Sequence, residues 1–128
     1  MIYIDSSILL AHLLTEVRRP PLLLWDEPLM SSRLLEYEVW TRLNARDLHR
    51  SHGKLASELI ARVALVELSR TVLERALQPF PLPLRTLDAL HLASIEFMRR
   101  LKQNIELATY DRRLAAAARA MEISVLAL

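Results

Sequence analysis

Short apolar runs of strand length alternate with longer runs of helical periodicity along this chain. The strand-length runs cover residues 1–4, 27–32, 63–68, 105–110 and 123–128, and each but the last precedes a helical pattern. The helical patterns predict helices over 6–14, 32–48, 54–62, 70–78, 86–102 and 111–120. Such alternation places strands side by side in one direction, with helices on the faces of the sheet. The chain therefore predicts an α/β fold built on a parallel sheet.

Length and composition predict one domain, covering residues 1–128. A chain of 128 residues, 52% of them hydrophobic, can bury one substantial core but not two. It has no cysteine, which excludes disulfides, a thiolate metal site and a cysteine nucleophile. No signal peptide is recognisable, and no apolar run approaches the roughly 18 residues that a membrane span needs. We expect a cytoplasmic protein without a membrane anchor.

The charges favour an anionic partner. The net charge is +2, and fifteen of the seventeen cations are Arg, whose planar fork suits phosphate and carboxylate groups. If four acids form a buried cluster, eleven acids remain against seventeen cations, and the rest of the surface carries +6. A surface of that charge attracts RNA or an acidic protein segment.

Three aspartates stand where predicted strands end or predicted helices begin. Asp5 comes directly after the first strand, Asp111 comes directly after a later strand, and Asp88 lies near the start of a helix. In parallel α/β sheets the carboxyl ends of the strands and the helix N-termini meet at one edge, where ligands bind. We expect the three carboxylates to lie close together there. The alternative for Asp88 is structural, since the helix dipole stabilises an acid in the first turn.

A fourth carboxylate comes from the helix predicted over 32–48, which carries both Glu36 and Glu38. At about 100° per residue, Glu38 falls on the apolar side with Leu34, whereas Glu36 falls on the opposite, solvent side. We therefore assign Glu38 to the acidic group and Glu36 to the surface. A purely structural alternative pairs Glu38 with Arg42, one helical turn later.

Four carboxylates in one crevice repel each other unless some stay protonated or a cation holds them together. Because the ligands are oxygens and the chain has no cysteine, a hard ion is favoured, Mg²⁺ or Mn²⁺. An ion held in this way typically polarises a phosphoryl oxygen and activates water for in-line attack. The pattern thus predicts phosphodiester hydrolysis.

Other kinds of site have less support. The histidines show no spacing typical of a metal site: His12, His49, His52 and His91. We expect His49 and His52 to lie at a helix end in a polar loop. Gly53 is the only glycine, which excludes glycine-rich phosphate loops, and no G-x-S-x-G motif is present. Trp25 and Trp40 are isolated and predict core or dimer contacts.

Together these motifs resemble a PIN-domain ribonuclease, and more closely the VapC-type toxins of bacterial toxin–antitoxin pairs. The resemblance covers essentially the whole chain and rests on D-S-S after the first strand, S-x-L-x-x-x-E, R-T-L-D-A-L-H-L-A and T-Y-D-R-R-L-A-A-A-A. It implies a three-layer α/β/α sandwich with a central, mostly parallel sheet of four to five strands. It also implies an acidic, Mg²⁺-dependent endoribonuclease site, a homodimer, and a cognate antitoxin whose C-terminal segment enters the active-site groove.

The resemblance carries over to individual positions. It implies that the catalytic and metal-binding acids are Asp5, Glu38, Asp88 and Asp111. Ser7 and Thr109 match hydroxyl positions that orient these carboxylates, and Arg85 is a candidate for a substrate phosphate or for pairing with one of the acids. Where the family usually has Gly after the last helix, this chain has Glu122, and we expect the turn there to differ locally.

The function expected from the sequence is that of a Mg²⁺-dependent endoribonuclease, the toxin of a toxin–antitoxin pair, which cuts RNA by metal-activated water. One alternative is a PIN-like module that binds an antitoxin or RNA with negligible catalysis. Another is a housekeeping RNA-processing nuclease, which shares the chemistry and differs in its partner.

Overall fold

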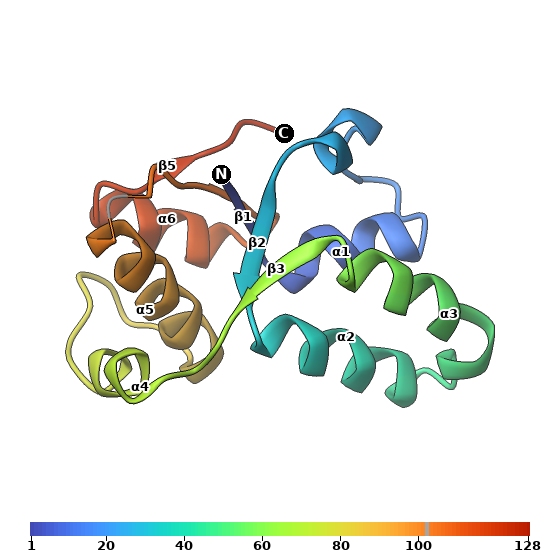
Figure 1. Cartoon of the computed structure of the whole chain (residues 1–128), viewed down its shortest axis with the longest axis horizontal. Helices are drawn as coiled ribbons and strands as arrows, with labels where there is room; N and C mark the ends of the chain where they lie inside the picture. The colour runs from blue at the N-terminus through green and yellow to red at the C-terminus, as the bar shows by residue number, and fades with distance from the viewer. Residues whose placement is uncertain (102) are drawn as a thin grey trace.

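The computed structural model describes residues 1–101 and 103–128 and confirms an α/β fold with a parallel sheet. Five strands follow the order β3-β2-β1-β4-β5, and each neighbouring pair is parallel (Figure 1). The strands are β1 (Ile2–Ile4), β2 (Leu29–Ser32), β3 (Val63–Val66), β4 (Glu106–Ala108) and β5 (Ser124–Val125). Because β1 is central, the residue that follows it stands in the middle of the carboxyl edge of the sheet.

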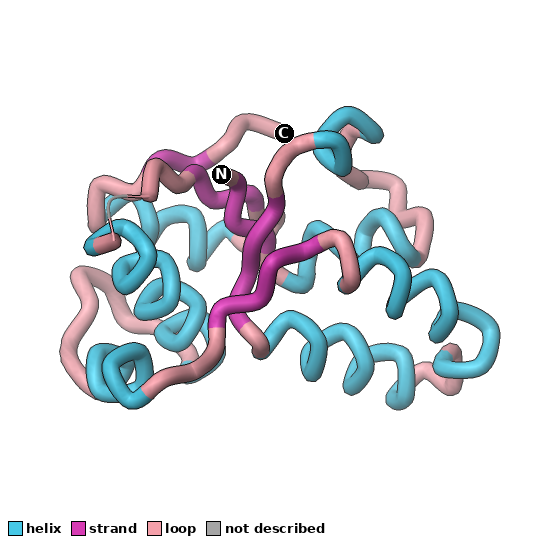
Figure 2. The backbone as a smooth tube through the Cα atoms, viewed as in Figure 1, coloured by secondary structure: helices cyan, strands magenta, loops and turns pink. Residues whose placement is uncertain are grey.

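The described residues form six α-helices in the order that the sequence predicts. Figure 2 shows these helices in cyan around the magenta strands. They are α1 (Ser6–Leu13), α2 (Leu34–Ala45), α3 (His49–Ile60), α4 (Arg70–Ala76), α5 (Thr86–Arg100) and α6 (Arg112–Ala120). Residue 102, the last of the helix predicted over 86–102, lies outside the described residues. A short 3₁₀ helix, Leu22–Asp26, was not predicted. Among the described residues, no helix has both the length and the apolar character needed to cross a membrane.

The sheet separates two hydrophobic layers, which gives the expected sandwich of three layers. Successive side chains of β1 point to opposite faces. Ile2 and Ile4 pack with the residues of α1, α2 and α3, whereas Tyr3 packs with those of α5 and α6. Figure 1 shows the two helical groups on either side of the strands. Trp25 is buried in the first layer, as predicted for a core residue, and Trp40 packs at its margin.

The third helix begins five residues earlier than predicted. His49 and His52 lie in the first turn of α3, so their placement in a polar loop is wrong. The cause is Asp47, which adopts a left-handed conformation with φ of 55°. This turn ends α2 with a hydrogen bond from the Leu48 amide to the Leu43 carbonyl, at 2.8 Å, and the chain enters α3 at once.

The last helix also ends in a left-handed turn, without the glycine that usually forms one. Glu122 has φ of 60°, and the Ile123 amide donates to the Ala118 carbonyl at 2.9 Å while the Glu122 amide donates to Arg119 at 3.0 Å. These are the two hydrogen bonds of a Schellman motif. The expectation that this turn differs locally was therefore wrong: the turn keeps the geometry that suits glycine, and Glu122 bears the strain.

Replacing Glu122 by Gly is expected to raise the free energy of unfolding by about 1 kcal/mol, because a side chain in the left-handed region costs roughly that much. Urea unfolding followed by circular dichroism measures the change. Glu122→Ala is the matched control, since it removes the exposed carboxylate but keeps the strained Cβ, and we expect no gain from it. Equal stabilisation by both substitutions would contradict the strain argument.

Candidate functional site

Four carboxylates gather at the carboxyl edge of the sheet, and we call them the acid cluster: Asp5, Glu38, Asp88 and Asp111. Asp5 follows β1 directly, Asp111 lies three residues beyond the Ala108 end of β4, and Asp88 lies in the first turn of α5. Their charges act on one another. Glu38 raises the pKa of both Asp5 and Asp88, in each case behind the larger effect of burial. The topology therefore brings together residues that are up to 106 positions apart.

Asp5 is the most enclosed of the four, with 6% of its surface exposed. Ser7 Oγ donates to its Oδ1 at 2.5 Å, and Thr109 Oγ1 donates to its Oδ2 at 2.6 Å. Burial raises the pKa of Asp5 above its ordinary value, and the two hydroxyl groups oppose that rise. Each carboxylate oxygen thus has one fixed donor, which sets the orientation of the group.

The same two hydroxyls fix the segment after β4. The Tyr110 amide donates to Ser7 Oγ at 3.0 Å, and the Asp111 amide donates to Thr109 Oγ1 at 2.9 Å. Each hydroxyl therefore donates to Asp5 and accepts from the Tyr110–Asp111 backbone. This arrangement joins the residue after the central strand β1 to the segment after its neighbour β4.

Asp111 caps the last helix. Its Oδ1 accepts from the amides of Arg113 and Leu114, at 2.9 and 3.1 Å, at the N-terminus of α6. Among the hydrogen bonds of residues 1–101 and 103–128, none involves Oδ2 of this carboxylate. Asp111 therefore has a structural role through one oxygen, and the other has no hydrogen-bond partner among the described residues.

Asp88 is half-buried, and no side-chain hydrogen bond of the described residues involves its carboxylate. Burial and the charges of Asp111 and Glu38 raise its pKa, while His91 and Arg85 lower it. Arg85 precedes α5 and is exposed, with no carboxylate within ion-pair distance in the part of the chain that the structure describes. Both alternatives for Arg85, a substrate phosphate or one of the acids, stay predictions.

Glu38 is held by a histidine that the sequence analysis did not assign to the site. His91 Nε2 lies 2.7 Å from Glu38 Oε1, and His91 Nδ1 lies 2.7 Å from the hydroxyl of Tyr3. His91 is buried, with 2% exposed. The Arg42 alternative does not appear among the ion pairs of the described residues; Ser6 Oγ is the second partner of Glu38, at 3.3 Å.

A signal for His91 was present in the sequence. It lies three residues after Asp88, in a helix face of Leu and Ala, where a buried imidazole needs a polar partner. The identity of that partner follows only from the fold, because Tyr3 and His91 are 88 residues apart.

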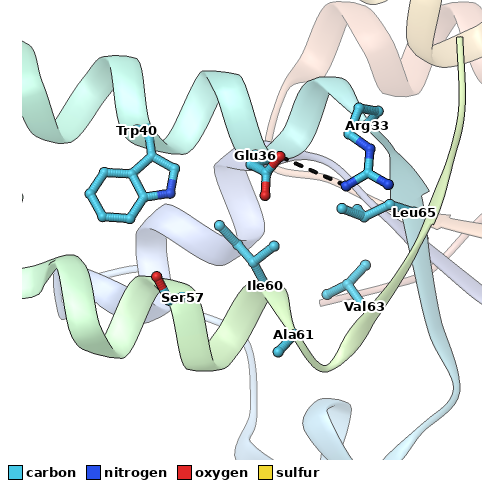
Figure 3. Close-up of a pocket in the computed structure, with 8 residues that line it drawn as sticks. All are labelled: Arg33, Glu36, Trp40, Ser57, Ile60, Ala61, Val63 and Leu65. Atoms are coloured by element: carbon cyan, nitrogen blue, oxygen red, sulfur yellow. Dashed lines mark ion pairs between the residues drawn. The ribbon is translucent and has the colours of Figure 1, made fainter.

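Glu36 points away from the acid cluster, as its position on the helix predicts. Its carboxylate pairs with Arg33 at 3.7 Å, beside a pocket of about 380 Å³ between α2 and α3 (Figure 3). Trp40 and Ile60 line the same pocket. Arg33 also pairs with Glu67. Glu36 and Glu38 therefore have separate partners, Arg33 and His91, and the assignment of Glu38 to the catalytic group stays a prediction.

The donor set of the acid cluster suits a hard divalent cation, since every candidate ligand is a carboxylate oxygen and two of the acids have raised pKa values that a bound cation would lower. Within residues 1–101 and 103–128, however, no three Asp, Glu or His side chains are already arranged so that they could hold a metal ion. The chemistry of the ligands fits such an ion, and a preformed cage is absent from the described residues.

Comparisons with known proteins identify the family of this chain. A family model described as the PIN domain matches residues 2–120. Ribonuclease VapC46 of Mycobacterium tuberculosis is 34% identical over 130 residues, which cover 98% of this chain and 96% of that protein. The crystal structure of M. tuberculosis VapC20, described as a toxin that cleaves the sarcin–ricin loop, has the same fold. It aligns with a TM-score of 0.66 and 24% identity over 91% of this chain and 95% of the VapC20 chain.

Proposed function

Since this chain belongs to the PIN-domain family and is a VapC-type ribonuclease by its relatives, we propose that it is a Mg²⁺-dependent endoribonuclease and the toxin of a toxin–antitoxin pair. The observation that carries the proposal is the acid cluster: four carboxylates at one sheet edge, with Asp5 oriented by two hydroxyls. VapC ribonucleases in general depend on a divalent metal, and Mg²⁺ is the choice that an oxygen-only ligand set favours.

Asp5 and Asp88 are the proposed main ligands, with Asp111 Oδ2 and Glu38 completing the shell. When bound, the ion polarises a phosphodiester oxygen and lowers the pKa of the attacking water. Ser7 and Thr109 keep both oxygens of Asp5 in place, so that its charge is oriented before the ion binds. His91 restrains Glu38 in the same way through Oε1.

The proposed partners are an RNA substrate, a cognate antitoxin and a second copy of the chain, in the cytoplasm. A groove of about 360 Å³ beside the acid cluster supports the antitoxin assignment. It contains Glu38 together with the apolar side chains of Leu10, Leu34, Tyr37 and Leu87. A helical or extended segment with apolar anchors fits a surface of this kind and, once bound, covers Glu38.

RNA cleavage by the purified, partner-free protein is expected to stop in EDTA and to return with Mg²⁺ or Mn²⁺, because the carboxylates alone supply no positive charge to the phosphodiester. Gel analysis of total cellular RNA measures this, and discrete products indicate a specific endonuclease. Asp88→Asn serves as the control for contaminating nuclease.

Cleavage that persists in EDTA would contradict the metal dependence. Absence of any cleavage by the wild-type protein, with either metal and a broad pool of RNA, would favour a binding module with negligible catalysis. If metal-dependent cleavage is found but no antitoxin-like reading frame stands next to the coding sequence, the housekeeping nuclease is favoured.

A further inference from the structure

We propose that a groove on the Asp111 side of the acid cluster binds the sugar-phosphate backbone of RNA through Arg18, Arg112 and Arg119, an inference that rests on the proposed function. The groove has a volume of about 560 Å³. It runs between α6, the segment after β4 and residues 125–128, and Arg18 enters it from the loop after α1. We call it the arginine groove.

The arginine groove carries an excess of positive charge. Among the ion pairs of residues 1–101 and 103–128, none involves Arg18, Arg112 or Arg119. Three other arginines do have carboxylate partners there: Arg33, Arg75 and Arg100. Among the described residues, Asp111 has the one acidic side chain that lines the groove, and its Oδ1 is engaged in capping α6. Three guanidinium groups are therefore available to an anion that enters from solvent.

The three side chains are spaced along the groove. Arg112 and Arg119 are seven residues apart on α6, which places them on the same side of the helix, about 10 Å apart along its axis. Arg18 lies over the ring of Tyr110, with its guanidinium carbon 4.6 Å from the ring centroid. Stacking of this kind restrains an exposed arginine and leaves its N–H groups free to bind phosphate oxygens.

The arginine groove leads directly to the acid cluster. Thr109 and Asp111 line it, and these residues also contact Asp5 or belong to the cluster. A polyanion that approaches four carboxylates is repelled unless nearby cations offset that charge. Phosphates on one side of the scissile bond would meet the three arginines while the scissile phosphate lies at the cluster. A single-stranded RNA, with one charge on every nucleotide, fits this arrangement.

The test compares two triple variants that remove the same charge. The first replaces Arg18, Arg112 and Arg119 by Gln. The control replaces Arg50, Arg70 and Arg113 by Gln; these residues are exposed, do not line the groove, and include the immediate neighbour of Arg112 on α6. Both are made in an Asp5→Asn background to prevent cutting. Fluorescence anisotropy with a short, labelled, mixed-sequence single-stranded RNA measures the Kd over a range of salt concentrations.

We expect the groove variant to bind RNA about tenfold more weakly than the control variant. The slope of log K against log salt is expected to fall by about 2, since three phosphate contacts at about 0.7 each are lost. With Asp5 restored, KM for RNA cleavage should rise while kcat changes little, because the arginines contact phosphates that do not react. Thermal unfolding of both variants should match that of the parent.

Other outcomes separate this inference from the proposed function. If the wild-type protein cleaves RNA and the two triple variants bind RNA with equal Kd, the arginine groove is not an RNA site, although the enzyme assignment stands. The same holds if the groove variant loses affinity for a poly-glutamate peptide but keeps its affinity for RNA, which would identify an acidic protein segment as the ligand. If the wild-type protein does not cleave RNA and the Asp5→Asn protein does not bind it, both the proposed function and the groove assignment are wrong.

Discussion

Replacing Asp5 by Asn is expected to lower the rate of RNA cleavage by about a thousandfold or more and to leave the fold intact. Asp5 is central in the acid cluster, and both of its oxygens are oriented by hydroxyl donors. Loss of its charge removes several kcal/mol of stabilisation from a metal-assisted transition state, and each 1.36 kcal/mol corresponds to a factor of ten in rate.

The fold should tolerate this change because the ionised form of Asp5 is disfavoured by its burial. The pKa of Asp5 is raised in the folded protein, so the folded state binds more protons than the unfolded state between the two pKa values, and stability falls as pH rises through that window. Asn has nearly the same volume and carries no charge, so it avoids this cost, which offsets the one hydroxyl hydrogen bond that is lost because the amide nitrogen of Asn cannot accept it. We expect the melting temperature at neutral pH to be unchanged or slightly higher.

Single-turnover cleavage of RNA in saturating Mg²⁺ measures the rate, and differential scanning calorimetry measures the stability. Asp26→Asn is the matched control, since Asp26 is exposed at the end of the 3₁₀ helix and lies outside the acid cluster. We expect the control to cleave at the wild-type rate. An Asp5→Asn protein that is folded and cuts RNA as fast as this control would remove Asp5 from the catalytic group.

Replacing His91 by Ala is expected to lower the free energy of unfolding by about 3 kcal/mol and the cleavage rate by a factor of about 10 to 100. The substitution removes one hydrogen-bond partner from the buried hydroxyl of Tyr3 and one from Oε1 of the half-buried Glu38. Each buried polar group that loses its hydrogen bond costs about 1–3 kcal/mol. The loss of activity follows because Glu38 is no longer oriented, a typical effect of removing a residue that positions a metal ligand.

Two further variants separate orientation of Glu38 from general destabilisation. Tyr3→Phe removes the hydroxyl, which also accepts from the Ser32 amide at 3.1 Å, and leaves the contact between His91 and Glu38; we expect a loss of about 2 kcal/mol and nearly full activity. His52→Ala tests the loss of a histidine on the surface, where its partner is Ser51, and we expect little change in either property.

Urea unfolding and Mg²⁺ titration of the cleavage rate, both at a temperature at which every variant is folded, measure these effects. Orientation of Glu38 by His91 predicts that His91→Ala needs a higher Mg²⁺ concentration for half-maximal activity, whereas Tyr3→Phe does not. Identical Mg²⁺ requirements in both variants would reduce His91 to a structural residue.

Much of the candidate site could be predicted because its acids occupy positions with local signals. Asp5 and Asp111 directly follow apolar strand patterns or precede helical ones, and parallel topology then places such residues at one edge. Glu38 differs from Glu36 by its side of a helix, which the 100° rotation per residue reveals. These signals, position after a strand and side of a helix, are properties of short stretches of sequence and do not depend on contacts with distant segments.

Other features of the site depend on contacts between segments that are far apart in the sequence. The partner of Glu38 is His91, 53 residues later, and not Arg42, which is its neighbour on the same helix. The position of Arg18 over Tyr110 likewise joins the loop after α1 to the end of β4. Local sequence patterns do not predict such residue pairs, because these contacts depend on the order of strands in the sheet and on how the helices pack against it.

Local periodicity and position in the sequence thus predict the α/β class and the order of the strands and helices along the chain, which the structure confirms, and they also predict the four carboxylates of the acid cluster. The tertiary structure decided the order of strands within the sheet, the hydrogen bonds that orient Asp5 and Glu38, and the start of α3 at His49. The physical reason is that hydrogen bonds and packing between residues far apart in sequence form only when the whole chain is folded, and they override local preferences where the two disagree.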